Sequence, residues 1–290
     1  MSSKQSPLTI RDIDRLSEMH DIEKLQKEIW GVADIEIFPA LALVAMKEVG
    51  AILVGAFDRD QMVGFVFGFP GLSNGRVVIH SDMLGVKPSY RAFGLGRKLK
   101  LAQRDRALAL GIERITWTFD PLQSVNAHLN FARLGVIADR YEIDFYGKTS
   151  SFLHRIGTDR LWVTWLLNSP RVNARIAEGS HDSVAQPFLE DLPALVYVGP
   201  EQEPQSNDYA PGDERTLIEI IDDAKLLRSN EQLALRWRET TRQAFRKATD
   251  SGYVVEEFWR QPALGKGVYI LRRVLNGIET LAGTGSAFLT

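Results

Sequence analysis

The chain has 290 residues, of which 44% are hydrophobic, and its formal net charge is −2 at pH 7. This near-neutral balance argues against general nucleic-acid binding, and the absence of Cys excludes disulfides, thiolate zinc sites and a Cys nucleophile. No window approaches the roughly 18 apolar residues of a membrane span, and the first residues lack the apolar core of a signal peptide. We therefore expect a soluble, cytoplasmic protein with no nucleic-acid and no membrane partner.

Hydrophobic spacing in the N-terminal half predicts alternating strands and helices. Apolar residues recur at helical spacing up to Trp30, and two apolar runs flanking Asp58 to Gln61 indicate a hairpin. The expected order is a strand over 7–11, helices ending at 30 and covering 39–49, hairpin strands over 51–57 and 62–69, a strand over 77–86, and a helix over 95–110. The last strand, turn and helix together form an arrangement that presents backbone N–H groups to an anion.

The stretch around this turn is unusually basic. It contains six cations and no carboxylate between Met83 and Arg104: Lys87, Arg91, Arg97, Lys98, Lys100 and Arg104. Arg97 and Lys98 fall in the first helical turn, where the positive end of the helix dipole disfavours cations. An anionic ligand with more than one charge would remove this conflict. The alternative is a solvated basic helix face.

The glycines of the turn narrow the choice of anion. Gly96 is followed by Arg97-Lys98 rather than by the Lys-Ser/Thr of a Walker A loop, and the third glycine of a dinucleotide fingerprint is replaced by Leu99. What remains is Leu84-x-Val86-x-Pro88-x-Tyr90-Arg91-x-x-Gly94-Leu95-Gly96. This string resembles the acyl-CoA loop of the GNAT acyltransferase superfamily, Arg/Gln-x-x-Gly-x-Gly/Ala after a strand that ends in apolar-x-Val.

The resemblance implies a fold and a donor. The fold would be an α/β (α+β) one, with a mixed, mostly antiparallel central sheet flanked by helices, and the co-substrate would be acetyl-CoA or another acyl-CoA. Backbone N–H groups of the loop would bind the CoA pyrophosphate. The residues that the resemblance assigns to CoA are Leu84, Gly85, Val86, Arg91, Ala92, Phe93, Gly94, Leu95, Gly96, Arg97 and Asn126.

The next elements are expected to be a strand over 115–119, a helix from Ser124 to Leu134-Gly135, and strands over 141–146 and 161–167. The helix is similar to the family's Asn-x-x-Ala…Phe-Tyr-x-x-Leu-Gly-Phe helix, which lines the pantetheine arm of CoA. The family's tyrosine often protonates the departing thiolate. Because Phe131 stands in its place, that role is in doubt or belongs to another group.

Residues 171–290 are expected to form a second α/β region packed on a GNAT domain of residues 1–170. The predicted elements are strands over 195–198 and 216–220, a loop over 199–213, a short helix over 222–227, a long helix to Ser251, strands over 253–258 and 267–271, and a frayed tail from 276. A capping box, Ser229-x-x-Gln232, would open the long helix, with Leu233, Trp237, Ala244, Phe245 and Ala248 on one face and Gly252 at its C-cap. The order echoes the end of a GNAT half, so the region could be a degenerate second half.

Acyl transfer to an amine requires a base, an oxyanion donor and a proton for the thiolate. His80 falls where several superfamily members place a Glu base, and Asp82 follows two residues later, on the same strand face unless a bulge intervenes. A backbone N–H within 84–86 would stabilise the oxyanion, and Tyr146 is the candidate acid. The alternatives are a structural His80, a packing role for His128, and an Asp120 that either forms a turn or lines the acceptor site.

We therefore predict an acyl-CoA-dependent N-acyltransferase that moves an acetyl group, or a larger one such as succinyl, directly to an amine. The expected acceptor is a small molecule such as an amino acid, with a homodimer left open. No grouping of His, Asp and Glu has metal-ligand spacing, so no metal is expected. Two alternatives remain open: a non-catalytic acyl-CoA-binding or sensor protein, and an acetyltransferase for protein lysines or N-termini.

Overall fold

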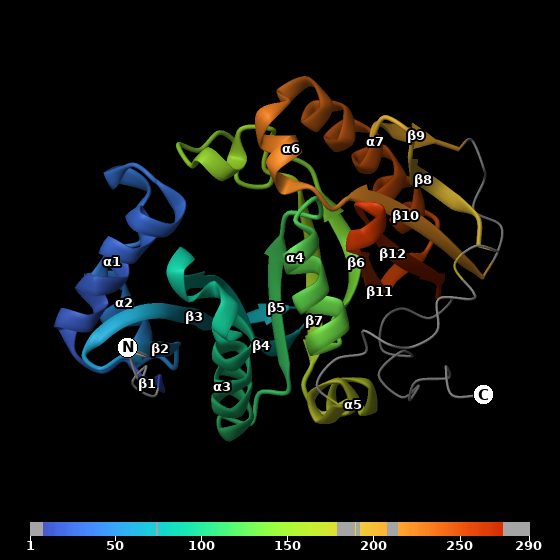
Figure 1. Ribbon diagram of the computed structural model, residues 1–290. Helices are drawn as coiled ribbons and strands as arrows, with labels where there is room; N and C mark the ends of the chain where they lie inside the picture. The colour runs from blue at the N-terminus through green and yellow to red at the C-terminus, as the bar shows by residue number, and fades with distance from the viewer. Residues whose placement is uncertain (1–7, 74, 179–188, 190–191, 208–213, 275–290) are drawn as a thin grey trace, which may run out of the picture. The chain divides into compact units, whose positions relative to one another are not determined.

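The computed structural model describes residues 8–73, 75–178, 189, 192–207 and 214–274. The chain divides into two compact units, the first formed by residues 1–117 and 149–155 and the second by residues 118–148 and 156–290. Both are mixed α/β units with mostly antiparallel strands flanked by helices, which confirms the predicted fold class (Figure 1). The predicted domain boundary at residue 170 stays a prediction, because the compact units divide the chain at other places.

The first unit carries neighbouring strands in the order β1-β2-β3-β4-β5. Strands β1 to β4 are antiparallel, whereas β4 and β5 run parallel, in register at Ile79↔Ile115 and His80↔Thr116. Its elements are β1 (Thr9–Asp12), α1 (Leu16–Trp30), η1 (Asp34–Glu36), α2 (Ala40–Glu48), β2 (Ile52–Asp58), β3 (Gln61–Ser73), β4 (Arg76–Val86), η2 (Pro88–Phe93), α3 (Leu95–Ala109), β5 (Arg114–Phe119) and η4 (Phe152–His154). The strands and helices predicted up to residue 119 are therefore confirmed.

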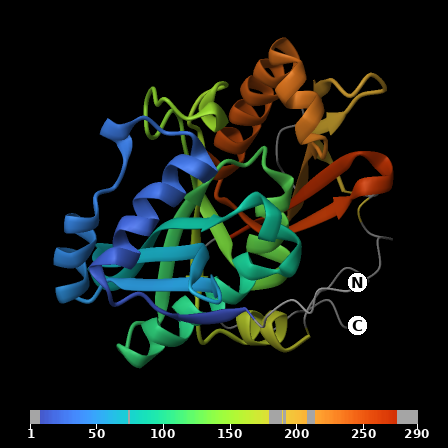
Figure 2. The same cartoon turned by 60° about the vertical axis from the view of Figure 1, so that its left-hand side comes forward.

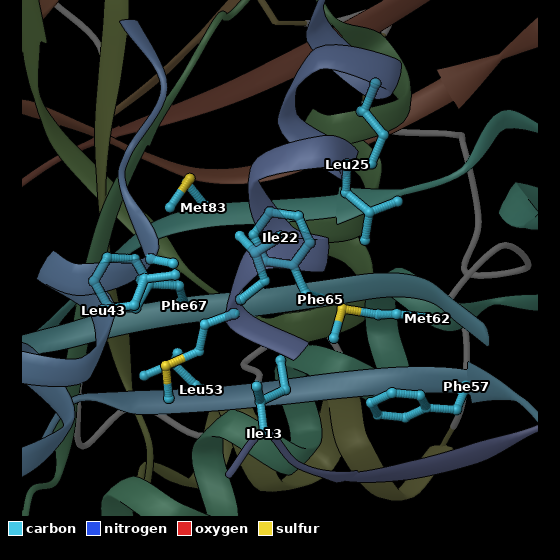
Figure 3. Packing of buried hydrophobic residues seen from close by; sticks show 13 residues of the cluster. Ile13, Ile22, Leu25, Leu43, Leu53, Phe57, Met62, Phe65, Phe67 and Met83 are labelled. Atoms are coloured by element: carbon cyan, nitrogen blue, oxygen red, sulfur yellow. The ribbon is translucent and has the colours of Figure 1, made fainter. Parts of the chain in front are cut away.

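Helices α1 and α2 cover one face of strands β2 to β4. The apolar residues of α1 that recur at helical spacing are buried there against alternate residues of the strands, which Figure 3 shows from close by. Ring pairs tie the layers together, with centroids 5.9 Å apart for Trp30 and Phe65 and 5.2 Å apart for Phe38 and Phe67. In Figure 2, α1, in blue, crosses over the paler strands that it covers.

Helix α3 covers the opposite face of these strands. Alternation along β3 turns Phe67 toward α1, and a Cβ added to the next residue, Gly68, would lie 2.7 Å from Gln103 Nε2 of α3. The buried residues of α3 are Leu95, Leu99, Lys100, Gln103 and Ala107. A lysine and a glutamine thus stand among the residues that this helix buries, and their partners matter for the site described below.

The second unit carries neighbouring strands in the order β7-β6-β11-β12-β10-β8-β9. Its elements are α4 (Ser124–Ala127), η3 (His128–Arg133), β6 (Ile137–Glu142), β7 (Arg160–Leu166), α5 (Pro170–Glu178), β8 (Ala194–Val198), β9 (Pro204–Ser206), β10 (Arg215–Ile221), α6 (Ala224–Ser229), α7 (Glu231–Asp250), β11 (Tyr253–Gln261), η5 (Pro262–Leu264) and β12 (Lys266–Arg273). The segment η3 is a π-helical continuation of α4.

Helix α7 supplies two of the largest buried side chains of this unit, Trp237 and Phe245. Trp237 is fully buried and its Nε1 donates to the carbonyl of Gln202 at 2.9 Å. Phe245 stacks on Tyr141 and meets Tyr269 edge-on, with ring centroids 5.4 and 5.2 Å apart. The predicted stripe is confirmed for Trp237, Ala244, Phe245 and Ala248, whereas Leu233 is half-buried and Ala234 takes the buried position.

Three local predictions in the second unit are wrong. The strand predicted over 141–146 runs instead from Ile137 to Glu142, because Asp144 adopts a left-handed backbone with φ of 45°. The long helix is capped by Asn230, whose side chain accepts from Leu233 N at 3.0 Å; Ser229 is the last residue of α6. The loop predicted over 199–213 contains strand β9. The tail from 276 lies outside the described residues.

Among the residues that the structure describes, no single helix is long and apolar enough to cross a membrane. Taken together, Leu16–Trp30 and Asp34–Glu48 reach that length and composition, but they are bent by 119° relative to one another.

Candidate donor-binding loop and catalytic residues

The turn between β4 and α3 is held by contacts to the neighbouring hairpin. Lys87 N donates to the carbonyl of Val63 at 2.9 Å, and the Tyr90 hydroxyl donates to Asp58 Oδ2 at 2.7 Å. The same hydrogen bond raises the pKa of Tyr90. The turn ends at Gly94, whose φ of 66° is left-handed and favours glycine. The loop therefore delivers the chain into α3 in one fixed direction.

The N-terminus of α3 has no capping side chain and no acidic residue in its first turn. Its first intrahelical hydrogen bond runs from Lys98 N to the carbonyl of Gly94 at 3.2 Å. The N–H groups of Leu95 and Gly96 precede that bond and have no partner within the helix. With the helix dipole, they give this end of α3 the properties of an anion site.

The cations of the basic stretch are only partly available to such an anion. Lys87 forms an ion pair with Glu28, Nζ to Oε2 at 2.9 Å. Lys100 is 2% exposed and lies beneath the helix. Arg91 and Lys98 are exposed, and Arg91 Nε donates to the carbonyl of Val86 at 3.3 Å. Arg91 thus lies against the end of β4, beside the turn.

Lys100 has a wholly different environment from that of a ligand-binding cation. Its Nζ donates to Ser81 Oγ at 2.7 Å and to Gln103 Oε1 at 3.2 Å, and lies 3.6 Å from the centroid of the Trp117 ring. Burial lowers the pKa of Lys100 well below its usual value. Sequence reasoning could not predict this burial, because a lysine at a buried helix position looks like any other cation of the stretch.

Strand β4 contains a β-bulge between the two candidate bases. Phe69 pairs with His80 and Phe67 with Met83, so β4 has one residue more than β3 over this interval. The bulge places His80 and Met83 on one face although they are three residues apart. It breaks the alternation that would have put Asp82 on the face of His80, and Ser81 turns toward Lys100 of α3.

The two candidate bases differ in their surroundings. His80 is half-buried; its Nδ1 lies 3.1 Å from Thr116 Oγ1, and its ring centroid lies 5.7 Å from that of Phe69. Asp82 remains accessible to solvent, yet the protein atoms around its carboxyl raise its pKa by desolvation. Both groups therefore have features of a base.

Gly85 packs against the core of the first unit. A Cβ at this position would lie 3.0 Å from Ile29 Cδ1 and 3.0 Å from Phe65 Cε1. The glycine therefore lets α1 approach β4 closely, and its assignment to CoA stays a prediction.

The remaining predicted residues lie in the second unit. Asn126 is exposed on α4, whereas Phe131 of η3 is fully buried, 6.2 Å from the ring of Phe119 and 5.9 Å from that of Tyr269. The position of the family's tyrosine is therefore part of the core here. The structure does not bring Tyr146 and Asn126 together with the loop residues inside one unit.

Tyr146, the candidate acid, lies in a polar group of the second unit. It is 45% exposed; its hydroxyl is 3.2 Å from Thr118 Oγ1, and its ring centroid is 5.1 Å from Cζ of Arg160. Asp120 accepts from Arg238 Nη2 at 2.8 Å and from Leu122 N at 3.0 Å. Asp120 is thus both a turn residue and the counter-ion of a buried arginine.

A second carboxylate completes this group. Asp159 is fully buried and accepts two hydrogen bonds from Arg242, both at 2.8 Å, and one from the Tyr141 hydroxyl at 2.7 Å. The sequence analysis assigns no role to Asp159 or Arg160. Arg238 and Arg242 were missed, because their partners lie far away along the chain. Among the described residues no group of three or more His, Asp or Glu could hold a metal ion.

A family model matches part of the first half of the chain. The family model described as "Acetyltransferase (GNAT) family" matches residues 16–136. No curated protein sequence matches the chain.

Three solved structures to which part of the chain is similar are as follows. A putative GNAT acetyltransferase from Desulfovibrio desulfuricans is 15% identical with a TM-score of 0.45, covering 56% of this chain and 99% of its own. A putative acetyltransferase from Salmonella typhimurium, solved with acetyl-CoA, is 17% identical with a TM-score of 0.45 and coverages of 56% and 95%. An aminoglycoside 6'-acetyltransferase type Ii is 19% identical with a TM-score of 0.41 and coverages of 55% and 97%.

Proposed function

Because the chain carries a GNAT acetyltransferase domain over residues 16–136 and belongs to that superfamily through it, we propose that it is an acyl-CoA-dependent N-acyltransferase. The proposed reaction moves an acetyl group, or a larger one such as succinyl, from CoA to an amine by direct transfer. A small molecule such as an amino acid is the proposed acceptor.

One structural observation carries the proposal. A left-handed glycine, Gly94, leads from β4 into a helix of 15 residues whose N-terminus has neither a capping side chain nor an acidic residue. Two backbone N–H groups there, on Leu95 and Gly96, lack partners in the helix. A pyrophosphate would accept hydrogen bonds from both, and its charge would favour the positive end of the dipole.

Arg91 would add a charged contact to the same donor. It is exposed beside the turn, and its Nε contact to the Val86 carbonyl leaves further N–H groups of the guanidinium for an anion. Lys87 and Lys100 contribute nothing to this contact, because one is paired with Glu28 and the other is buried.

The chemical step needs a base for the amine. When His80 Nδ1 donates its proton to Thr116 Oγ1, Nε2 carries the lone pair that can accept a proton. Asp82 is the alternative, since its raised pKa makes it a stronger base than an ordinary carboxylate. The amine nitrogen would attack the thioester carbonyl; the C–N bond forms as the C–S bond breaks.

The departing thiolate needs a proton, and Tyr146 is the proposed donor because the family's tyrosine is replaced by Phe131. Phe131 has no hydroxyl and is fully buried. That replacement also supports the alternative, a non-catalytic acyl-CoA-binding protein. An acetyltransferase of protein lysines or N-termini is the other alternative, and the nature of the acceptor separates it from the main proposal.

A two-way panel tests the proposal. Acetyl-CoA and succinyl-CoA are each mixed with free amino acids, other small amines and peptides, and released thiol is measured for the wild type and for His80→Ala. Acceptor-dependent thiol release by the wild type supports the enzyme, and the favoured acceptor identifies the class. CoA binding without release for any pair would favour the sensor, and release with peptides alone would favour the protein acetyltransferase.

A further inference from the structure

One nitrogen of a buried arginine has no partner. Arg238 of α7 is 2% exposed; its Nη2 donates to Asp120 Oδ1 at 2.8 Å and its Nε to the carbonyl of Ile156 at 3.3 Å. Its Nη1 is fully buried and makes no hydrogen bond. Buried polar groups nearly always have partners, and an unsatisfied charged donor is costlier than a neutral one. Arg238 Nη1 is therefore a buried donor that has no acceptor among the described residues.

A second buried arginine lies within electrostatic range of it. Arg160 is 6% exposed, and its Nη1 donates to the carbonyl of Asp159 at 3.1 Å. Burial has the largest effect and lowers the pKa of Arg160, and the charge of Arg238 lowers it further. Asp120, Tyr146 and Asp159 oppose this shift. Burial thus disfavours the charge of Arg160. For Arg238, burial lowers the pKa but the charge of Asp120 opposes it, and the net shift is upward.

The nearby carboxylates do not accept from this nitrogen. Asp120 accepts from Arg238 Nη2 and from Leu122 N, both through Oδ1, and Asp159 is held by two hydrogen bonds from Arg242 and one from Tyr141. Neither supplies the acceptor that Arg238 Nη1 lacks. An anion placed there would satisfy that donor and offset the repulsion between the two arginines.

The group reaches solvent at Tyr146. This side chain is 45% exposed, lies over Arg160 and meets Thr118 through its hydroxyl. Its loop contains Asp144 and Gly147, both with left-handed backbone. A ligand that entered past Tyr146 would present its anionic end to the arginines and leave its other end at a residue that we propose as the acid.

We propose that Arg238 Nη1 and Arg160 bind the carboxylate of the acceptor, so that the substrates are amines that also carry a carboxylate. A carboxylate fits because it is planar, singly charged and able to accept one hydrogen bond from each guanidinium. The inference rests on the proposed function, since it names the class of acceptor for that reaction.

The test compares each amino acid with its own carboxamide, which keeps the amine and removes the charge. For the wild-type full-length protein, kcat/KM should favour the carboxylate. In Arg160→Gln and Arg238→Lys the preference should fall by roughly 10- to 150-fold, the range expected for hydrogen bonds to charged groups. The loss should appear in KM for the acid while rates on the carboxamide stay similar. Arg140→Gln, which removes a half-exposed arginine of the same unit, should leave the preference unchanged.

A binding measurement separates this inference from the proposed function. N-acetylated amino acids should raise the melting temperature of the wild type without CoA, their carboxamides should not, and Arg160→Gln should abolish the effect. Transfer to amines with no preference for the carboxylate would overturn the inference and leave the proposed function intact. If no amine is acylated, the proposed function fails. The carboxylate site is then supported only if N-acetylated amino acids still raise the melting temperature in a way that depends on Arg160.

Discussion

Replacing Lys100 with Met should stabilise the protein near neutral pH and change the way its stability depends on pH. Lys100 is 2% exposed, and its ammonium group would lie over Trp117, 3.6 Å from the ring centroid, with Ser81 and Gln103 as hydrogen-bond partners. A desolvated cation–π contact contributes about 2 kcal/mol, whereas burying an ammonium costs several kcal/mol. Burial therefore dominates, and the pKa of Lys100 is lowered.

The direction of this pH dependence follows from the numbers of protons that the folded and unfolded chains bind. The unfolded chain binds the lysine proton up to a pH of about 10.4, while the folded protein releases it at lower pH. Between the folded and unfolded pKa values, stability rises with pH by about 1.4 kcal/mol per unit. Lys100→Met lacks this dependence, although it loses two hydrogen bonds of about 1 kcal/mol each. Its advantage should be largest at low pH and should shrink as pH approaches the unfolded value.

Urea unfolding at several pH values between 6 and 10, followed by tryptophan fluorescence, measures both curves. Lys98→Met is the matched control, because Lys98 is an exposed lysine on the same helix. The reasoning would be refuted if the stability of Lys100→Met and of the wild type changed in parallel over the whole range, which would mean that the buried amine stays charged.

Three further predictions concern the catalytic base, a buried tryptophan of the second unit and a buried carboxyl of the same unit. If His80 is the base, His80→Ala should lower kcat by about 10²–10⁴ and leave CoA binding intact. The acidic limb of the pH–rate profile should disappear in the same variant. If that limb instead disappears in Asp82→Asn, Asp82 is the base. Trp237→Ala should cost about 3–5 kcal/mol in urea unfolding, since the ring is fully buried and Nε1 is bonded; a loss below 1 kcal/mol would contradict its core role. Burial raises the pKa of Glu256, so its contribution to stability is present at low pH and lost as pH rises through the folded value. Glu256→Gln should therefore gain on the wild type as pH rises, and parallel curves, with the exposed Glu214→Gln as control, would oppose this.

The sequence was sufficient to predict the strand, turn and helix around Gly94 and most elements beside them, because those features are local. Gly94, the uncapped helix start and the flanking strand lie within about twenty residues, and apolar spacing locates each element directly. Two local predictions, the cap of a helix and the start of a strand, were nevertheless wrong. The cap of α7 is Asn230 rather than Ser229, and β6 begins earlier than predicted because pairing with β7 outweighs the charged residues within it.

The roles of individual charged residues could not be predicted from local sequence. Lys100 and Lys98 are both cations of one helix, and only the packing of α3 on the strands shows that one is buried and the other exposed. The bulge that separates Asp82 from the face of His80 depends on the register between β3 and β4. Arg238 meets Asp120 across 118 positions of sequence, a contact without any local signal.

The central claim is that the N-terminus of α3 binds the pyrophosphate of an acyl-CoA, and calorimetric titration of CoA tests it most directly. CoA and pantetheine, which lacks the pyrophosphate, are titrated into the wild type, Arg91→Ala and Gly96→Val. Arg76→Ala, from the other end of β4, is the control. Arg91→Ala should weaken CoA binding by about 1.5–3 kcal/mol and Gly96→Val should also weaken it, while pantetheine binding and the control stay unchanged. Unaltered CoA affinity in both variants, with both proteins folded, would contradict the claim.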